Sequence, residues 1–125
     1  MATVNNDTIR NSMLDGIRTD AVFNNGHIRI RRSDDTMLAE LDYSADAFDS
    51  AAATGSMTSN TVTAEASAVA AGDATHVDLE TSADASQLEC TVGVGSGEFQ
   101  FSGSLTIASG DEVSLTGNTH TISFA

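Results

Sequence analysis

The sequence contains no lysine, no proline and no tryptophan, and its one cysteine is Cys90. A single cysteine excludes an intrachain disulfide. Without proline there is no proline-rich linker, so turns must be formed by the ten glycines together with Asn, Asp and Ser. No apolar run approaches the ~20 residues that span a bilayer, and the first ten residues are polar. We therefore expect a soluble protein with no export signal and no membrane association.

Large core-forming side chains are also scarce. The chain has five Phe and one Tyr, and alanine supplies much of its 40% hydrophobic content. Its 125 residues are the length of one domain, and such a domain buries roughly two-thirds of its unfolded surface. We expect a single domain over residues 1–125 with a thin core, whose stability is supplemented by oligomerisation or by docking onto a partner.

The charge is strongly segregated along the chain. All five basic residues lie in the first 32 residues, where three aspartates leave a net charge of +2, whereas residues 33–125 carry −15. Such an acidic body opposes binding to nucleic acid and to anionic membranes. Two interpretations of the arginines remain open: they dock on an acidic partner, or they pair with carboxylates of the same chain. The five are Arg10, Arg18, Arg29, Arg31 and Arg32.

An excess of acidic residues with no lysine is also typical of proteins that work in high salt. In 1 M salt the Debye length falls to about 3 Å, so repulsion between carboxylates on such a surface is screened. A halophilic or marine source is a hypothesis that this composition supports.

One helix is predicted near the start of the chain. Residues 1–6 are polar, and we expect them to be flexible. Asp7 is a good N-cap for a short helix over residues 7–18, in which Ile9, Met13 and Ile17 recur at a spacing of four and form one apolar face. Leu14 widens that face.

The rest of the chain alternates between short apolar segments and turn signals. Residues 27–31 alternate with period two, which places Ile28 and Ile30 inward and the arginines outward. The pattern predicts a mainly β fold, a β-sandwich or jelly-roll-like domain of about eight short strands over residues 27–125. Phe48 is expected to anchor the connection after the second strand. The further strands are expected at 37–43, 57–66, 75–79, 88–94, 99–101, 105–107, 113–115 and 119–124.

No residue pattern in the chain points to catalysis. His27, His76 and His120 each fall on the polar side of an expected strand with no second ligand at metal spacing, so we expect them to be exposed. Cys90 falls between apolar residues and is expected to be a small buried hydrophobe. The glycine-rich segment 93–97 has no lysine and no following helix, so it indicates a turn and not a phosphate loop. We predict no enzyme activity, no catalytic residue and no cofactor.

Two groups of aspartates are candidates for a cation site. Asp42, Asp46 and Asp49 lie close together in sequence, and Asp34 and Asp35 are adjacent. Calcium takes six to eight oxygen ligands, and no D-x-D-x-D-G loop is present. A solvated acidic surface is therefore the favoured interpretation, and we predict no metal site.

Three segments carry a resemblance to a known family. Residues 10–17 read R-N-S-M-L-D-G-I, residues 26–30 read G-H-I-R-I, and residues 38–48 read L-A-E-L-D-Y-S-A-D-A-F. In this order they resemble a family of small virion proteins of tailed bacteriophages and related viruses. The similarity is specific over the first 48 residues, and further on, around residues 58–60 and 119–124, it is compositional. Many members have proline where this chain has Asp46.

The resemblance implies a structural role in a virus particle. The first expectation is a capsid decoration or cement protein, made in the host cytoplasm, that binds the outside of the head shell and stabilises it. Its partners would be the major capsid protein and copies of itself, with a homotrimer as one arrangement, and the five arginines would face the shell. The alternative is a neck, tail or fibre-associated component.

Overall fold

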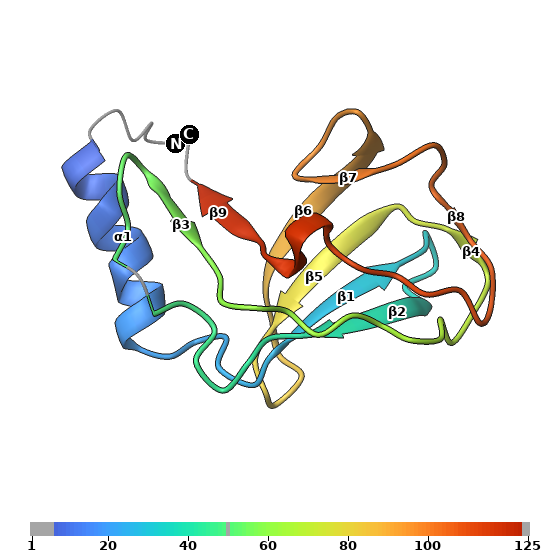
Figure 1. The fold of residues 1–125 in the computed structure, drawn as a ribbon, viewed down its shortest axis with the longest axis horizontal. Helices are drawn as coiled ribbons and strands as arrows, with labels where there is room; N and C mark the ends of the chain where they lie inside the picture. The colour runs from blue at the N-terminus through green and yellow to red at the C-terminus, as the bar shows by residue number, and fades with distance from the viewer. Residues whose placement is uncertain (1–6, 50, 124–125) are drawn as a thin grey trace.

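The computed structural model describes residues 7–49 and 51–123, and it shows a mainly β, sandwich-like fold with one helix, as predicted (Figure 1). Two sequence-based expectations, the flexible residues 1–6 and a last strand that reaches Phe124, concern positions outside the described residues. Within the described part, no helix is both long and apolar enough to cross a membrane.

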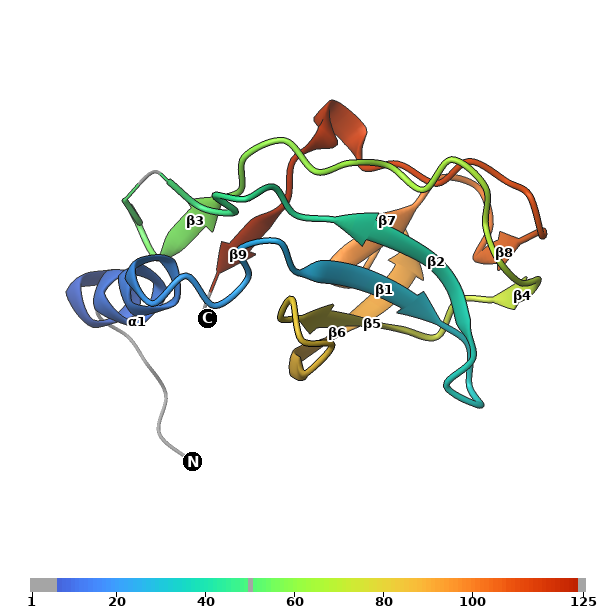
Figure 2. The same cartoon turned by 90° about the horizontal axis from the view of Figure 1, so that it is seen from below.

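The main sheet has five strands in the order β2-β1-β5-β6-β7. All neighbouring pairs are antiparallel except β6 and β7, which are parallel. Figure 2 shows the sheet curling beneath the connection from β3 to β4 and the connection from β8 to β9, which together form the second layer. The five strands are β1 His27–Arg31, β2 Met37–Asp42, β5 His76–Glu80, β6 Ser86–Val94 and β7 Phe99–Phe101.

Two small sheets complete the fold, and they are shorter than the sequence predicted. One pairs β3 with β9 and the other pairs β4 with β8. Most of the strand expected at 57–66 and all of that expected at 113–115 reduce to single bridges, such as Glu65 with Val113. These segments pair with their neighbours only at single positions, so no continuous ladder forms. The bounds are β3 Ser56–Thr58, β4 Gly72–Asp73, β8 Thr106–Ile107, a 3₁₀ turn η1 Thr116–Asn118 and β9 Thr121–Ser123.

The turn that enters β1 requires glycine. Asn25 adopts a positive φ of 55°, a conformation that Asn tolerates. At Gly26 a Cβ atom would lie 2.2 Å from the carbonyl oxygen of Glu80, so a larger residue would push β1 away from β5. The strand that follows alternates as expected, because Ile28 and Ile30 are buried and the two arginines between and after them lie on the opposite face.

Helix α1 spans Asp7–Thr19 and packs against β3 and β9 at one end of the main sheet (Figure 1). Leu14 is fully buried and Ile17 is half-buried, but Ile9 and Met13 are 56% and 45% exposed. The spacing of four places Ile9, Met13 and Ile17 along one side of the helix, as predicted. The domain covers this side unevenly, because Ile17 packs against the core whereas Ile9 and Met13 are exposed.

An aromatic cluster joins the helix end of the molecule to the main sheet. The ring centroids of Phe23 and Tyr43 are 5.6 Å apart, and that of Phe48 lies 5.6 Å from Tyr43 and 6.4 Å from Phe23. All three rings are buried. The prediction that Phe48 anchors the connection after the second strand is confirmed.

Candidate functional site

The outer face of the main sheet is covered with charged side chains. Residues directly opposite one another on neighbouring strands share a face, and the register aligns β1, β2, β5 and β6 so that their polar positions meet. We call this surface the charged face. It consists of His27, Arg29, Arg31, Glu40, Asp42, His76, Asp78, Glu80 and Glu89.

Glu80 is the centre of the charged face. Its side chain is only 2% exposed, and its two oxygens accept hydrogen bonds from Arg29 Nη1 and Arg31 Nη2, each at 2.9 Å. Each arginine also donates from Nε to a second carboxylate at 2.8 Å, Arg29 to Glu40 and Arg31 to Asp78. The two guanidinium groups therefore tie three adjacent strands together.

The environment of both arginines favours their charged form. Burial alone would lower the pKa of Arg29, but the hydrogen bond to Glu40 and the charge of Glu80 outweigh burial and raise it. The pKa of Arg31 is raised in the same way by Glu80 and Asp78. The interpretation that the arginines pair with the chain's own carboxylates thus holds at these two positions.

The other three arginines do not join this cluster. Arg32 donates to Asp34 at 2.8 Å and to the carbonyl of Ala71, and it holds the pKa of Asp34 well below its usual range. On α1, Arg18 lies 3.4 Å from Asp15. Arg10, also on α1, is half-buried beside the Gly55 loop. The five arginines predicted as an interface are thus divided between the helix and the sheet, and their role in binding stays a prediction.

Two histidines on the charged face have carboxylate neighbours that sequence spacing did not show. His27 Nδ1 lies 2.8 Å from Asp42 and 3.5 Å from Glu40. These three residues could hold a metal ion, and so could His76, Asp78 and Glu89. The expectation that no second ligand is near these histidines is wrong, because antiparallel pairing brings carboxylates from adjacent strands beside each ring.

These two groups suit a divalent transition metal only in part. One imidazole with two carboxylates is a common donor set for such ions. However, Glu40 is already bound by Arg29 and Asp78 by Arg31. The guanidinium charge beside each group opposes a second cation there.

His120 is buried, contrary to the expectation that it is exposed. Its ring is stacked on Phe99 with a centroid distance of 4.6 Å, and its Nδ1 is hydrogen-bonded to the Tyr43 hydroxyl at 3.0 Å. The chain turns inward after η1, so the residue before β9 enters the core. Burial lowers the pKa of His120 to about 4.

We expect His120 to make stability depend on pH. Its pKa is near 6.5 in the unfolded chain and about 4 in the folded chain, so between these values the unfolded chain binds a proton that the folded chain does not. The free energy of unfolding should therefore fall as pH drops from 6.5 to 4, by about 3 kcal/mol from this residue. Urea unfolding of the native chain and of His120→Gln across this range measures the difference, and parallel pH profiles would contradict the assignment.

Cys90 is half-buried, not fully buried as expected. Burial raises the pKa of its thiol to about 11, and the nearby carboxylates of Glu98, Asp78 and Glu89 add to the effect. At neutral pH the group is thus a protonated thiol, which is a poor nucleophile.

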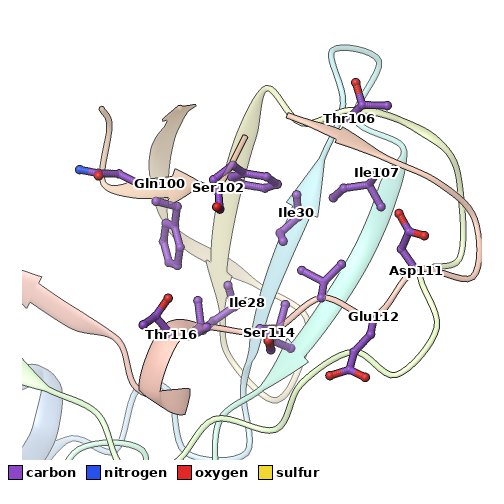
Figure 3. Close-up of a pocket in the computed structure, with 15 residues that line it drawn as sticks. Ile28, Ile30, Gln100, Ser102, Thr106, Ile107, Asp111, Glu112, Ser114 and Thr116 are labelled. Atoms are coloured by element: carbon purple, nitrogen blue, oxygen red, sulfur yellow. The ribbon is translucent and has the colours of Figure 1, made fainter. Parts of the chain in front are cut away.

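A cavity of about 340 Å³ opens on the concave side of the sheet. Figure 3 shows Ile28 and Ile30 on its floor and Ile107 on its wall. Asp111 and Glu112 lie at its margin, on the connection between β8 and η1. Its lining includes no histidine, cysteine or basic residue. This lining can bury an apolar group.

Comparison with known proteins found no relative of this chain. No protein-family model matches it, and neither the curated proteins nor the solved structures contain a significant match.

Proposed function

We propose that this chain is a virion structural protein, a capsid decoration protein that binds the outside of the head shell and stabilises it. The observation that carries the proposal is the exposure of Met13 on α1. This apolar residue lies in the first segment with the family resemblance, and it is 45% exposed. Ile9, one helical turn earlier, is 56% exposed. We call this pair the helix stripe.

Most other apolar positions in the resembling segments serve the core. Leu14, Ile28 and Leu41 are each no more than 1% exposed, so the fold itself accounts for them. The fold does not account for Met13 in this way. Its exposed side chain can contribute apolar area to a contact with another molecule.

The orientation of the helix stripe is set by hydrogen bonds on other faces of α1. Asn11 accepts a hydrogen bond from the backbone N–H of Gly55 at 2.9 Å, and Asp15 accepts one from that of Ala52 at 2.9 Å. Leu14 inserts into the core between these two polar contacts. A pre-oriented apolar pair loses little conformational entropy on docking, which favours binding.

The charge of the rest of the molecule fits the same role. With Arg29 and Arg31 neutralised inside the charged face, the remaining surface is dominated by carboxylates. Mutual repulsion of such surfaces keeps free copies from associating before assembly. Weak contacts of each copy with the major capsid protein, or between copies on the shell, would suffice because many copies bind one particle.

Copy number tests the proposed function directly. Quantitative gel densitometry of purified particles should find this chain in hundreds of copies per particle. A dozen copies or fewer would contradict decoration and support the alternative role in the neck, tail or fibres, where a single ring or trimer would form.

The helix stripe can be tested by substitution. Met13→Glu should weaken binding to undecorated particles about tenfold or more, because a docked Met side chain contributes about 1.5–3 kcal/mol. Ser12→Glu is the matched control, since Ser12 is an exposed neighbour on the same helix and receives the same charge. Co-sedimentation with particles measures binding, and thermal unfolding should show both variants as stable as the native chain. Equal binding by the two variants would contradict the helix stripe as the contact.

A further inference from the structure

Among the described residues, the outer edge of β6 lacks a strand neighbour over most of its length. The strand runs from Ser86 to Val94, but β7 pairs only with Val92–Val94. Over Ser86–Thr91, the strands that the structure describes pair with β6 on its β5 side alone. An open edge of this kind presents backbone hydrogen-bonding groups to any extended chain that lies beside it.

The hydrogen bond of Thr91 shows which backbone groups face outward. Its N–H is bonded to a carboxylate oxygen of Glu98 at 2.8 Å and not to β5. Along a strand, successive residues direct their backbone groups to opposite sides. Glu89, two residues earlier, therefore directs its N–H and its C=O away from β5, and the side chain of Glu89 is exposed.

A cavity of about 260 Å³ lies along this edge on the inner side of the sheet. Leu88 and Cys90 border it from β6, and His120 and Ile122 border it from the chain around β9. The only strand paired with β9 is β3 in the described part of the chain, so the cavity lies between two open strand edges.

The two sides of the edge differ in chemistry. The inner side presents the half-buried Leu88 and Cys90 together with the cavity. The outer side presents the exposed carboxylate of Glu89. Asp78, opposite it on β5, is already paired with Arg31, so Glu89 is the group that would attract a basic side chain. Side chains of an added strand alternate between the two sides, so a strand that fits here has apolar residues facing inward and basic residues facing outward.

We propose that the β6 edge binds an extended segment of another protein in which apolar and basic residues alternate. The segment adds antiparallel to β6, and a basic residue opposite Glu89 exchanges both backbone hydrogen bonds with it. Apolar side chains on either side of this basic residue enter the cavity. This site is separate from the helix stripe and does not depend on the proposed role in a virus particle.

A second copy of this chain fits the edge poorly. If β6 paired with β6 of a second copy, the Glu89 carboxylates of both copies would lie on the same outer side. Repulsion between these like charges would destabilise the pairing. The clearest alternation of apolar with basic residues in this chain is His27–Arg31, which is β1, and both of its edges are already paired. The partner segment is therefore expected from a different protein.

A pair of synthetic peptides tests the site on the full chain. The probe is a six-residue peptide of alternating Lys and Val with blocked ends, and its counterpart has Glu in place of Lys. The Lys-Val peptide should shift the amide resonance of Glu89 and slow the reaction of the Cys90 thiol with a disulfide reagent. The Glu-Val peptide should bind at least tenfold more weakly. Equal binding of the two peptides, or no binding of either, would overturn the proposal.

Backbone pairing is tested separately from charge attraction. N-methylation of the Lys amides should abolish binding, because those N–H groups face β6, whereas N-methylation of the Val amides should leave it unchanged. Glu89→Lys should weaken binding of the Lys-Val peptide at least tenfold. Glu112→Lys, the same charge change at an exposed site lining the other cavity, should not. Equal binding by both methylated peptides, or equal effects of both variants, would show charge attraction alone and overturn the site.

Discussion

Replacing Arg29 and Arg31 together by methionine is expected to lower the free energy of unfolding by about 3–5 kcal/mol. The double variant leaves the Glu80 carboxylate, which is 2% exposed, without either of its guanidinium partners. An uncompensated buried charge is far more costly than the loss of an exposed ion pair. Urea unfolding at pH 7 measures the difference.

Two further variants identify the cause of that loss. Adding Glu80→Leu to the double variant should restore much of the stability, because replacing a whole buried ion cluster by apolar residues is often nearly neutral. Arg32→Met breaks an exposed pair with Asp34 and should destabilise the fold far less than the double variant does. A double variant as stable as Arg32→Met would contradict the central role of Glu80.

This expectation also limits how the predicted arginine interface can be tested. Reversing the charge at Arg29 and Arg31 would place two more carboxylates around Glu80. The resulting variant would lose particle binding through unfolding, whether or not the arginines contact a shell. Substitutions at Met13 and Ser12 on α1 test particle binding without this loss of stability, since both side chains are exposed.

Phe48→Ala is expected to destabilise the fold by about 3–5 kcal/mol, the usual cost of deleting a buried aromatic ring. The Phe48 side chain is 3% exposed and packs edge-on against Phe23 and at a tilt against Tyr43. With few other large rings in the chain, neighbouring side chains cannot fill the space. Chemical denaturation followed by far-UV circular dichroism measures the loss.

Matched changes separate the role of the aromatic cluster from a general effect of truncation. Phe48→Leu keeps part of the buried volume and should cost clearly less than Phe48→Ala. Val94→Ala shortens a side chain that is 52% exposed and should change stability by less than about 0.5 kcal/mol. A Phe48→Ala variant no less stable than Val94→Ala would contradict the role of the cluster.

Local patterns predicted the elements that local physics controls. Alternation placed β1 at His27–Arg31, and capping with apolar periodicity placed the helix at 7–18, within one residue of α1. In each case the signal lies within a few residues, so it could be read without knowing what packs against the element.

The same patterns failed where a residue's neighbour is distant in sequence. Glu80 follows the alternating segment expected at 75–79, and nothing local shows that it is enclosed by two arginines about fifty residues earlier. His120 was placed on a polar strand face, but contact with Tyr43 and Phe99 buries it. Met13 was assigned to an apolar face that the domain covers at Leu14 and Ile17 but not at Met13.

For the candidate sites, the sequence supplied the composition and the fold supplied the arrangement. The sequence showed that the charges are segregated. It left two interpretations of the arginines open, docking on an acidic partner and pairing with carboxylates of the same chain. Strand register decided that choice for Arg29 and Arg31 by aligning β1 with β2 and β5. The open edge of β6 had no local signal, because the pairing of a strand depends on segments that are far away in the sequence.

The sequence by itself determined that this chain is a mainly β, strongly acidic protein with one N-terminal helix, since alternation, turn residues and charge are local properties. Only the tertiary structure decided which charges are neutralised, which histidine is buried, and which apolar side chains and strand edges stay exposed. These features depend on register and packing between segments far apart in the chain. Small differences in that packing decide whether a carboxylate lies in water or between two guanidinium groups.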